Sequence, residues 1–385
     1  MLYKDQNFPN YMHIIALENE PSSRRGGQEL NLLEICRGLS KRGHTITLLY
    51  LKEGDLLKHY QEFCSQLVNV KTFMLDRHNI NYTFNFLADI FRVAVTKNSV
   101  VYSNRYQDIF FGFVLSLLNN IPQVCYLQLP PPGGFGRPHT MALKRVKKFI
   151  AVSNKTKLDW INSGFKDERI DVVYNGADSA VFKPSKDFSL TRKEWNIPEG
   201  TRVISYVGRL DKEKGLETLL KAFAAIVKSG ANAKLLIAGK PVSEGEEYKK
   251  SLEKLVSDLG IENYVSFLGH VDNTTSVYQV SDITVLPSLW SEPFGRTVVE
   301  SMTCGTPVVA SRTGGIPEIL TKEFQSGLFE AGDERNLADT LNRIINWRDK
   351  DRQLGERCRE YVLSKFTLDK LVEGIEQVLL GVVKQ

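Results

Sequence analysis

The sequence predicts an α/β protein of two doubly wound domains, each a parallel sheet with helices on both faces. Short apolar runs alternate with segments of helical period along the chain, which is typical of β–α–β units. The alternation pauses at the segment FKPSK, residues 182–186, and then begins again. A length of 385 residues also suits about two domains. We therefore place the domains at residues 1–182 and 187–366.

The amino-terminal half alternates between apolar strands and amphipathic helices. A helix is expected at residues 82–96, with its apolar side chains facing inward at helical spacing. These side chains are Phe84, Leu87, Ile90, Phe91 and Ala94. The expected strands lie at residues 12–17, 45–51, 70–74, 99–103, 123–127, 149–153 and 172–174.

The carboxyl-terminal half repeats the pattern and ends in helices. Ligands of such sheets bind at the carboxyl ends of the strands, which here suggests a cleft between the two domains. The expected strands lie at residues 202–207, 233–238, 265–268, 283–286 and 308–310, and the expected helices at 216–228, 248–259, 337–347, 352–365 and from 367 onward.

The composition indicates a cytoplasmic protein. No run of about 18 apolar residues occurs, which is the length that a membrane-spanning helix needs. The first 12 residues lack the apolar core of a signal peptide. Five scattered cysteines without a CxxC pair favour reduced, buried thiols.

The net charge of +5 is concentrated in the first half, where residues 1–182 hold 22 Lys and Arg against 16 Asp and Glu. This excess is either an ordinary solvated helix face or a contact for an anionic membrane surface or a phosphate-bearing acceptor. No nucleic-acid-binding motif accompanies it, so nucleic acid is not an expected partner. The cluster comprises Arg137, Lys144, Arg145, Lys147 and Lys148.

The stretch LPSLWSEPFGRTVVESMTCGTPVVASRTGG, residues 286–315, predicts an anion site. A helix begins at Gly295, Arg296 and Thr297, whose N–H groups have no partner within the helix. The positive end of the helix dipole favours an anion there. Glu300 lies more than a turn further in, and Glu292 precedes the helix. Both carboxylates suit hydroxyl groups beside a phosphate, although Glu is also common at exposed positions without any such role.

Further loops at strand ends carry residues that suit a phosphate ligand. Arg209 follows the first strand of the second half and can hold a phosphate with two donors. Lys214 opens the next helix and adds a second positive charge. In the first half, Gly26 and Gly27 lie where a loop becomes a helix, so the backbone there can approach a ligand or simply turn tightly.

Taken in order, these motifs resemble the family 4 retaining glycosyltransferases, which have the two-domain GT-B fold. The most specific match is E-x-F-G-x(4)-E, which runs from Glu292 to Glu300. The resemblance covers essentially the whole chain, and its other motifs are Gly208-Arg209-Leu210, Lys214-Gly215, G-x-P-V-V at residues 305–309, Gly314-Gly315, Gly26-Gly27, Val152-Ser153 and Asn175-Gly176-x-Asp178.

The resemblance implies two Rossmann-like domains that face each other across a cleft. The domain at residues 1–182 would bind the acceptor and would be joined by the carboxyl-terminal helix, about residues 367–385. The domain at residues 187–366 would bind the nucleotide sugar. The reaction would retain the anomeric configuration and would need no metal ion.

The resemblance also implies a role for each site residue. Arg209 and Lys214 would hold the diphosphate and stabilise the charge that grows on it as the glycosidic bond breaks. Gly26 and Gly27 would approach the diphosphate from the other domain. Glu300 would bind the ribose hydroxyls. The transferred hexose would be held by Glu292 and by the backbone around Phe294, Gly295 and Arg296, next to Thr297.

Two positions depart from the family pattern. Many members carry a histidine in the loop after the fifth strand, whereas this chain has Gln128, which can donate a hydrogen bond but cannot titrate. His139 lies close by in sequence and is a second candidate for a catalytic role. Arg296 stands where an apolar residue is common, and it would add a phosphate contact or bind an anionic acceptor.

We therefore expect a cytoplasmic hexosyltransferase, peripheral on the inner face of the membrane if the basic cluster binds lipid. It would move a hexose from a nucleotide-diphospho-sugar, with UDP-glucose favoured, to a glycan or lipid-linked glycan in polysaccharide or glycoconjugate synthesis. The alternatives are a nucleotide-sugar epimerase or a sugar phosphorylase on the same fold, and a non-catalytic sugar-binding or membrane-binding module. No bound cofactor and no metal site are expected. The D-x-D tripeptide at residues 349–351 lies in a charged segment away from any strand end.

Overall fold

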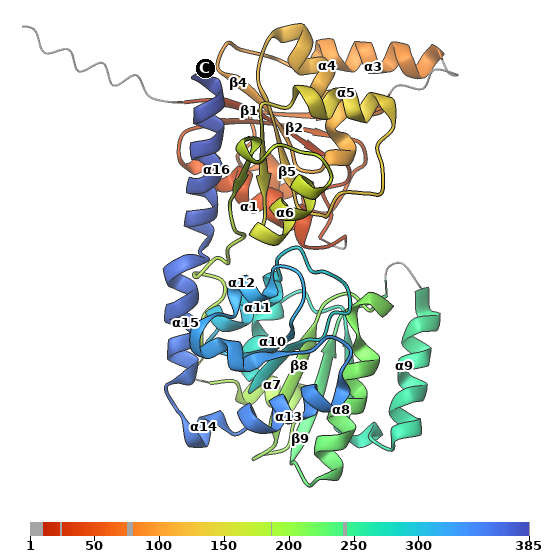
Figure 1. The fold of residues 1–385 in the computed structure, drawn as a ribbon, viewed down its shortest axis with the longest axis vertical. Helices are drawn as coiled ribbons and strands as arrows, with labels where there is room; N and C mark the ends of the chain where they lie inside the picture. Colours follow the sequence, from red (N-terminus) through yellow and green to blue (C-terminus); the bar gives the residue numbers. More distant parts are fainter. Residues whose placement is uncertain (1–10, 24, 75–79, 186, 242–244, 385) are drawn as a thin grey trace, which may run out of the picture. The chain divides into compact units, whose positions relative to one another are not determined.

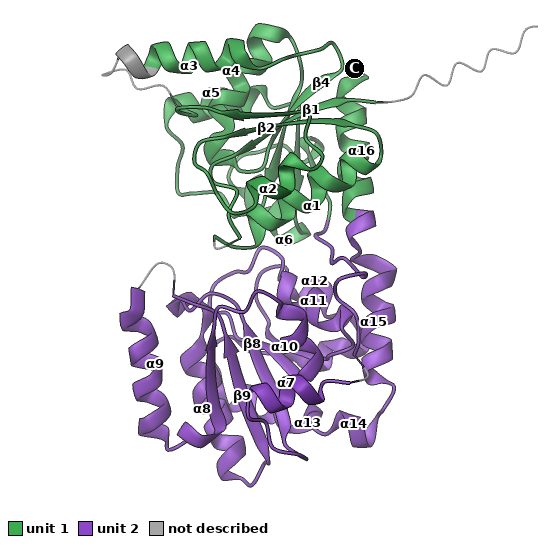
Figure 2. Ribbon diagram, turned by 180° about the vertical axis from the view of Figure 1, so that it is seen from behind, with its two compact units in different colours: residues 1–173, 371–385 green, residues 174–370 purple. Residues whose placement is uncertain are grey.

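The computed structural model describes residues 11–23, 25–74, 80–185, 187–241 and 245–384. The chain forms two compact units (Figure 2). Unit 1 comprises residues 1–173 and 371–385, and unit 2 comprises residues 174–370. The predicted linker at residues 182–186 lies within unit 2 by this division. Each unit is a parallel sheet with helices, so the predicted α/β fold class is confirmed.

The sheet of unit 1 has seven parallel strands in the order β3-β2-β1-β4-β5-β6-β7 (Figure 1). The order reverses direction between β1 and β4, which pair from His13 with Ser99 to Leu17 with Ser103. The strands are β1 (His13–Glu18), β2 (Thr45–Tyr50), β3 (Gln66–Asn69), β4 (Ser99–Ser103), β5 (Gln123–Leu127), β6 (Lys148–Ala151) and β7 (Ile170–Val172).

Helices cover both faces of this sheet. The side chains that point to either face along the central strands are therefore buried. Ile15 and Leu17 belong to a core shared with α3 to α6. On the other face, α1 and α16 pack closely, and a Cβ on Gly38 of α1 would meet Val372 of α16 at 2.5 Å. The helices are α1 (Gly27–Lys41), α2 (Leu57–Gln61), α3 (Ile80–Arg92), α4 (Ile109–Asn119), α5 (Arg137–Arg145), α6 (Asn154–Asn162) and α16 (Leu368–Val383).

Two sequence predictions in unit 1 were wrong. The third strand is β3 at Gln66–Asn69, and not at residues 70–74, where the chain has already left the sheet. The inward face of α3 was also misassigned: Phe84 and Phe91 are 73% and 79% exposed, and Leu87 and Ala94 are exposed as well. Ile90 is buried as predicted, and the helix also buries Phe86, whose ring packs against those of Phe110 and Phe111 of α4. Apolar residues occupy two faces of α3, so their periodicity could not decide which face the core would take.

The sheet of unit 2 has six parallel strands in the order β10-β9-β8-β11-β12-β13, and its direction reverses between β8 and β11. One face packs against α8, α9 and α13. The strands are β8 (Arg202–Val207), β9 (Ala233–Ala238), β10 (Val265–Gly269), β11 (Ile283–Leu286), β12 (Val308–Ser311) and β13 (Leu328–Phe329). The helices are α7 (Ser189–Glu194), α8 (Leu216–Lys228), α9 (Gly245–Leu259), α10 (Thr274–Val280), α11 (Arg296–Thr303), α12 (Ile316–Ile319), α13 (Glu334–Ile344), α14 (Trp347–Lys350) and α15 (Leu354–Lys365).

Among the residues that the structure describes, no helix is both long enough and apolar enough to cross a membrane.

Candidate active site

The predicted residues of unit 2 gather where its sheet reverses direction, at the carboxyl ends of β8 and β11. Parallel α/β sheets bind ligands at such a point. Lys214 lies in the turn that follows β8, and Glu292 lies in the loop that follows β11. The Lys214 Nζ donates to Glu292 Oε1 at 2.5 Å, although 78 residues separate the two in sequence. Ser288 Oγ donates to the same carboxylate oxygen at 2.6 Å.

Lys214 is held from several sides. Its ammonium group lies 5.2 Å from the centre of the Trp290 ring, a distance suited to a cation–π interaction. The Lys214 side chain is only 13% exposed, so little movement is open to it. Gly215 adopts φ +68, and a Cβ at this position would meet the Pro287 carbonyl oxygen at 2.1 Å. The glycine after Lys214 is therefore required for the two loops to approach each other.

The Arg209 side chain is more exposed than that of Lys214, at 40% against 13%. Its Nη1 lies 3.2 Å from Asp211 Oδ2. The backbone at this position is fixed, since the Tyr206 hydroxyl donates to the Arg209 carbonyl oxygen at 2.5 Å. Arg209 therefore presents an exposed guanidinium from a backbone position that a hydrogen bond holds.

Helix α11 begins at Arg296, as the motif predicts, and Gly295 precedes it with φ +109. Glu300 lies in the second turn, where Tyr278 donates its hydroxyl to Oε2 at 2.9 Å and Arg296 donates Nε to Oε1 at 3.2 Å. Burial, followed by the nearby Glu300 charge, raises the pKa of Tyr278 well above its usual value, so Tyr278 remains a donor. Arg296 thus contacts Glu300 directly in this structure.

Phe294 and Thr297 flank the start of α11 and are held by unit 2 itself. The Phe294 side chain is buried, and its ring lies against those of Tyr174 and Phe366. Only the backbone of Phe294 is therefore placed to meet a ligand. Thr297 Oγ1 donates to the Val207 carbonyl oxygen at 3.4 Å, which ties the first turn of α11 to the end of β8.

The predicted residues of unit 1 lie at the carboxyl edge of its own sheet or near it. Gly26 precedes α1 and Gly27 is its first residue. Gln128 directly follows β5 and is buried. Its Nε2 donates to Asn104 Oδ1 at 2.6 Å, so the donor that the sequence offered for substrate is engaged with the protein. His139 belongs to α5, and its Nε2 lies 3.1 Å from the Gln107 carbonyl oxygen.

Sequence reasoning missed three residues beside Gln128: Glu18, Asn104 and Asn31. Glu18 ends β1, Asn104 follows β4, and Asn31 lies in α1. All three are buried, and they form a hydrogen-bonded chain with Gln128. The signal that could have found Glu18 and Asn104 is a polar residue at the end of each of the two apolar strands that flank the reversal point.

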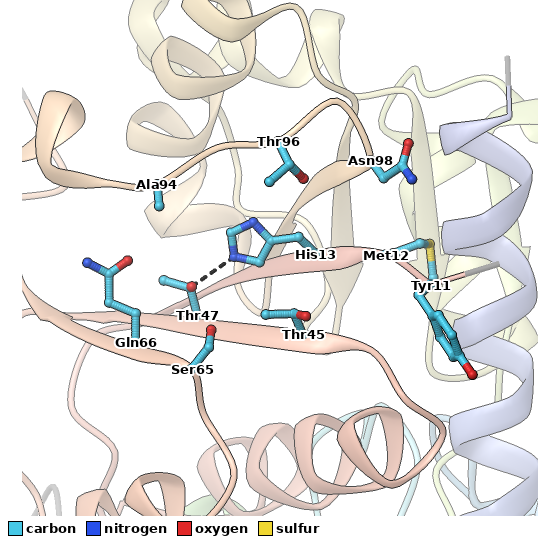
Figure 3. A pocket seen from close by; sticks show the side chains of 10 residues that line it. All are labelled: Tyr11, Met12, His13, Thr45, Thr47, Ser65, Gln66, Ala94, Thr96 and Asn98. Carbon is cyan, nitrogen blue, oxygen red and sulfur yellow. Dashed lines mark hydrogen bonds between the residues drawn. The ribbon is translucent and has the colours of Figure 1, made fainter. Parts of the chain in front are cut away.

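Two pockets among the described residues lie away from these edges. In unit 1, a pocket of about 650 Å³ opens at the amino-terminal ends of β1 and β2 (Figure 3). His13 lies within it, with Nε2 2.8 Å from Thr47 Oγ1, and burial lowers the pKa of His13. In unit 2, a pocket of about 310 Å³ is lined by residues that include Trp347 and Cys358. Neither pocket is lined by a predicted site residue.

No metal site can be built from the described residues, because nowhere do three histidine, cysteine, aspartate or glutamate side chains come together to hold an ion. The D-x-D tripeptide lies at the end of α14, where Asp349 pairs with Arg202 and Asp351 with Arg357. Its two carboxylates therefore belong to surface ion pairs.

The fold is that of a two-unit α/β protein of the GT-B type, and the candidate site residues of unit 2 gather at the carboxyl edge of its sheet. The model for "Glycosyltransferase Family 4" matches residues 25–181, and the model for "Glycosyl transferases group 1" matches residues 187–361. The chain belongs to the family 4-like glycosyltransferases.

Relatives and solved structures agree with this membership. The N-acetyl-α-D-glucosaminyl L-malate synthase of Bacillus anthracis is 34% identical over 215 residues, which are 56% of this chain and 54% of that protein. The D-inositol 3-phosphate glycosyltransferase of Corynebacterium kroppenstedtii is 34% identical over 206 residues, which are 52% of this chain and 45% of that protein. The match thus spans about half the length of these two relatives. The crystal structure of Anabaena HepE in complex with UDP and glucose superposes with a TM-score of 0.82 at 23% identity, covering 96% of this chain and 99% of that one.

Proposed function

We propose that this protein transfers a hexose, with retention of configuration, from a nucleotide-diphospho-sugar to a glycan or a lipid-linked glycan. The observation that carries the proposal is the pair of Lys214 and Glu292 beside the first turn of α11, where the sheet of unit 2 reverses. This edge offers positive charge for a diphosphate and carboxylates for hydroxyl groups. UDP-glucose is the favoured donor, since HepE binds UDP and glucose.

Each site residue has a role in this proposal. Arg209 and Lys214 hold the diphosphate, and the exposed Arg209 adjusts to it while Lys214 is already in place. Glu300 accepts from the ribose hydroxyls and Glu292 from the hexose. No metal ion is needed, because the fixed cations and the α11 N–H groups meet the charge that develops on the leaving diphosphate.

Two other classes remain alternatives. An epimerase or a phosphorylase on this fold would act on the sugar without a second glycan acceptor, and a binding module would not turn it over. The presence of Arg209, Lys214, Glu292 and Glu300 together at one edge of unit 2 disfavours the binding module.

A panel of nucleotide sugars tests the proposal directly. We expect one UDP-sugar to bind most tightly, to be hydrolysed slowly alone and in the presence of EDTA, and to release UDP faster when glycan acceptors are added. Epimerised sugar, or phosphate-dependent release of a sugar phosphate, would support the alternative enzymes instead. Binding without any turnover across the panel would overturn the catalytic assignment.

We further propose that unit 1 docks on an anionic membrane through α3 and α5. Both helices contact α4 and lie at the same end of unit 1 in both views (Figures 1 and 2). Phe84, Leu87 and Phe91 form an exposed apolar face on α3. Met141 is 58% exposed on α5 and is flanked by exposed basic residues, Arg137, Lys144 and Arg145. Apolar side chains beside basic ones are the combination that binds the surface of an anionic bilayer.

Replacing Phe84 and Phe91 together by serine is expected to weaken vesicle binding at least about tenfold, since burying one such side chain contributes ~1.5–3 kcal/mol. Co-sedimentation with phosphatidylcholine vesicles, with and without phosphatidylglycerol, measures this. Leu190→Ser is the matched control, because Leu190 is 81% exposed on α7 of unit 2 and lies outside the proposed surface. The proposed docking surface would be wrong if vesicle binding did not depend on phosphatidylglycerol, or if the double substitution left vesicle binding unchanged.

A further inference from the structure

The two strands at the reversal point of the unit 1 sheet and the strand next to them each end in a buried polar side chain. Glu18 ends β1, Asn104 follows the neighbouring β4, and Gln128 follows β5. This is the position at which open parallel sheets bind their ligands. A fully buried carboxyl group at such a point requires an explanation, because burial disfavours its charge.

The side chains form one chain of hydrogen bonds that starts at Glu18. Asn104 Nδ2 donates to Glu18 Oε2 at 3.5 Å, and also to the carbonyl oxygen of Gln28 in the first turn of α1 at 3.2 Å. Gln128 Nε2 donates to Asn104 Oδ1 at 2.6 Å. Asn31 Nδ2 then donates to Gln128 Oε1 at 3.4 Å.

The hydrogen bonds run in one donor-to-acceptor direction, and Glu18 sets that direction. Both Nδ2 hydrogens of Asn104 are used, on Glu18 and on Gln28, so the Asn104 oxygen must face Gln128. Gln128 therefore turns its amino group to Asn104 and leaves its carbonyl oxygen as the atom with a spare lone pair. This direction needs Glu18 to act as an acceptor only, which an ionised carboxylate does. The other oxygen of Glu18 accepts from the Asn19 N–H at 2.7 Å.

A protonated Glu18 does not fit this arrangement. One of its oxygens then becomes a donor, and both oxygens face N–H donors, from Asn19 and Asn104. The conflict is relieved if the Asn104 amide turns over to accept from Glu18. Gln128 must then turn over as well, and it presents its amino group in place of its carbonyl oxygen.

The groups around the Glu18 carboxyl place its ionisation near neutral pH. Burial, the charge of Glu29 on α1 and the charge of Asp108 raise the pKa of Glu18 to about 8, against the lowering effects of the Asn19 N–H and of Arg105. Arg25 pairs with Glu29 at 3.4 Å, and Arg105 lies 3.2 Å from Asp108. The thiol of Cys36 and the phenol of Tyr60 also face Glu18, and burial raises the pKa of each well above its usual value, so both stay neutral.

We propose that Glu18 is a positioning residue for glycosyl transfer: through Asn104 it sets the direction of the Gln128 amide, so that Gln128 offers its carbonyl oxygen to an acceptor hydroxyl only when Glu18 is ionised. The inference rests on the proposed function and on the expectation from the sequence that unit 1 binds the acceptor. It gives Gln128 a hydrogen-bond-accepting role in place of a titrating one.

The pH dependence of kcat tests the inference. In the unchanged protein, kcat should rise about tenfold between about pH 7 and pH 9, as the ionised fraction of a group with a pKa of about 8 does. Glu18→Gln carries an amide that donates to Asn104, so it should hold kcat at the low value across this range. Glu29→Gln removes the neighbouring like charge and should move the rise to lower pH. A rise that persists in Glu18→Gln would overturn the inference.

Side-chain NMR separates this inference from the proposed function. The amide ¹⁵N signals of Asn104 and Gln128 should titrate with a midpoint near pH 8, and Glu18→Gln should abolish the titration, whether or not the correct sugar donor is known. Stability gives a second readout: a raised pKa means that stability is greatest below the ordinary value of 4.5 and falls as pH rises to about 8, and Glu18→Gln should remove that fall. Amide signals that do not titrate in the unchanged protein would refute the inference even if transfer is confirmed.

Discussion

Lys214→Ala is expected to lower the rate of sugar transfer by about 10²–10³-fold, the loss typical of removing one preorganised donor from the developing negative charge. Lys214 is held between the Glu292 carboxylate and the Trp290 ring. A fixed charge needs no rearrangement as the diphosphate departs, so its contribution should be greater in the transition state than in the bound donor. The loss should therefore appear mainly in kcat rather than in KM for the nucleotide sugar.

The stability of the Lys214 variant needs separate attention, because the substitution leaves the buried Glu292 without its cation. Lys214→Met combined with Glu292→Gln removes both charges, and it should be inactive while it unfolds at nearly the same denaturant concentration as the unchanged protein. Lys212→Ala is the matched control, since Lys212 belongs to the same turn and is exposed. Transfer within about twofold of normal in Lys214→Ala would contradict the assignment of this site.

The unit 2 site could be predicted because most of its parts are close in sequence. A single stretch holds the end of β11, Glu292, the start of α11 and Glu300, and local rules on strands, turns and helix starts place them correctly. Those local rules could not predict the contact of Lys214 with Glu292. It depends on the strand order of the sheet, which brings β8 beside β11 across 78 residues of sequence.

Unit 1 shows two further limits of reading the sequence alone. The apolar residues of α3 were expected to face the core, yet Phe84 and Phe91 are exposed, because periodicity reports an apolar face without saying what covers it. Glu18 could not be predicted as a site residue, because its role depends on Asn104 and Gln128, which lie far from it in the chain. A buried polar chain becomes visible only when the neighbours of each strand end are known.

Gly314→Ala is expected to destabilise the protein by about 3 kcal/mol and to reduce transfer about 10²-fold. Gly314 has φ +58, where alanine is disfavoured by roughly 1 kcal/mol, and forcing an added methyl group into a packed site typically costs ~1–3 kcal/mol more. The added Cβ would lie 1.9 Å from the Glu292 carbonyl oxygen, which also accepts from the Gly315 N–H at 2.7 Å. The backbone of Glu292 must therefore move, and a displacement of ~1 Å in a catalytic group can cost about 10²-fold in rate.

Gly230→Ala supplies the matched control for Gly314→Ala. Gly230 also has a left-handed φ, +97, but a Cβ there would meet nothing within 4 Å. Its alanine variant should lose only about 1 kcal/mol, from conformational strain, and should keep full transfer activity. Urea unfolding and donor-saturated kinetics of the two variants measure the difference. Equal losses of stability would show that strain alone explains both glycines, and normal transfer by Gly314→Ala would show that the Gly314 turn does not position Glu292.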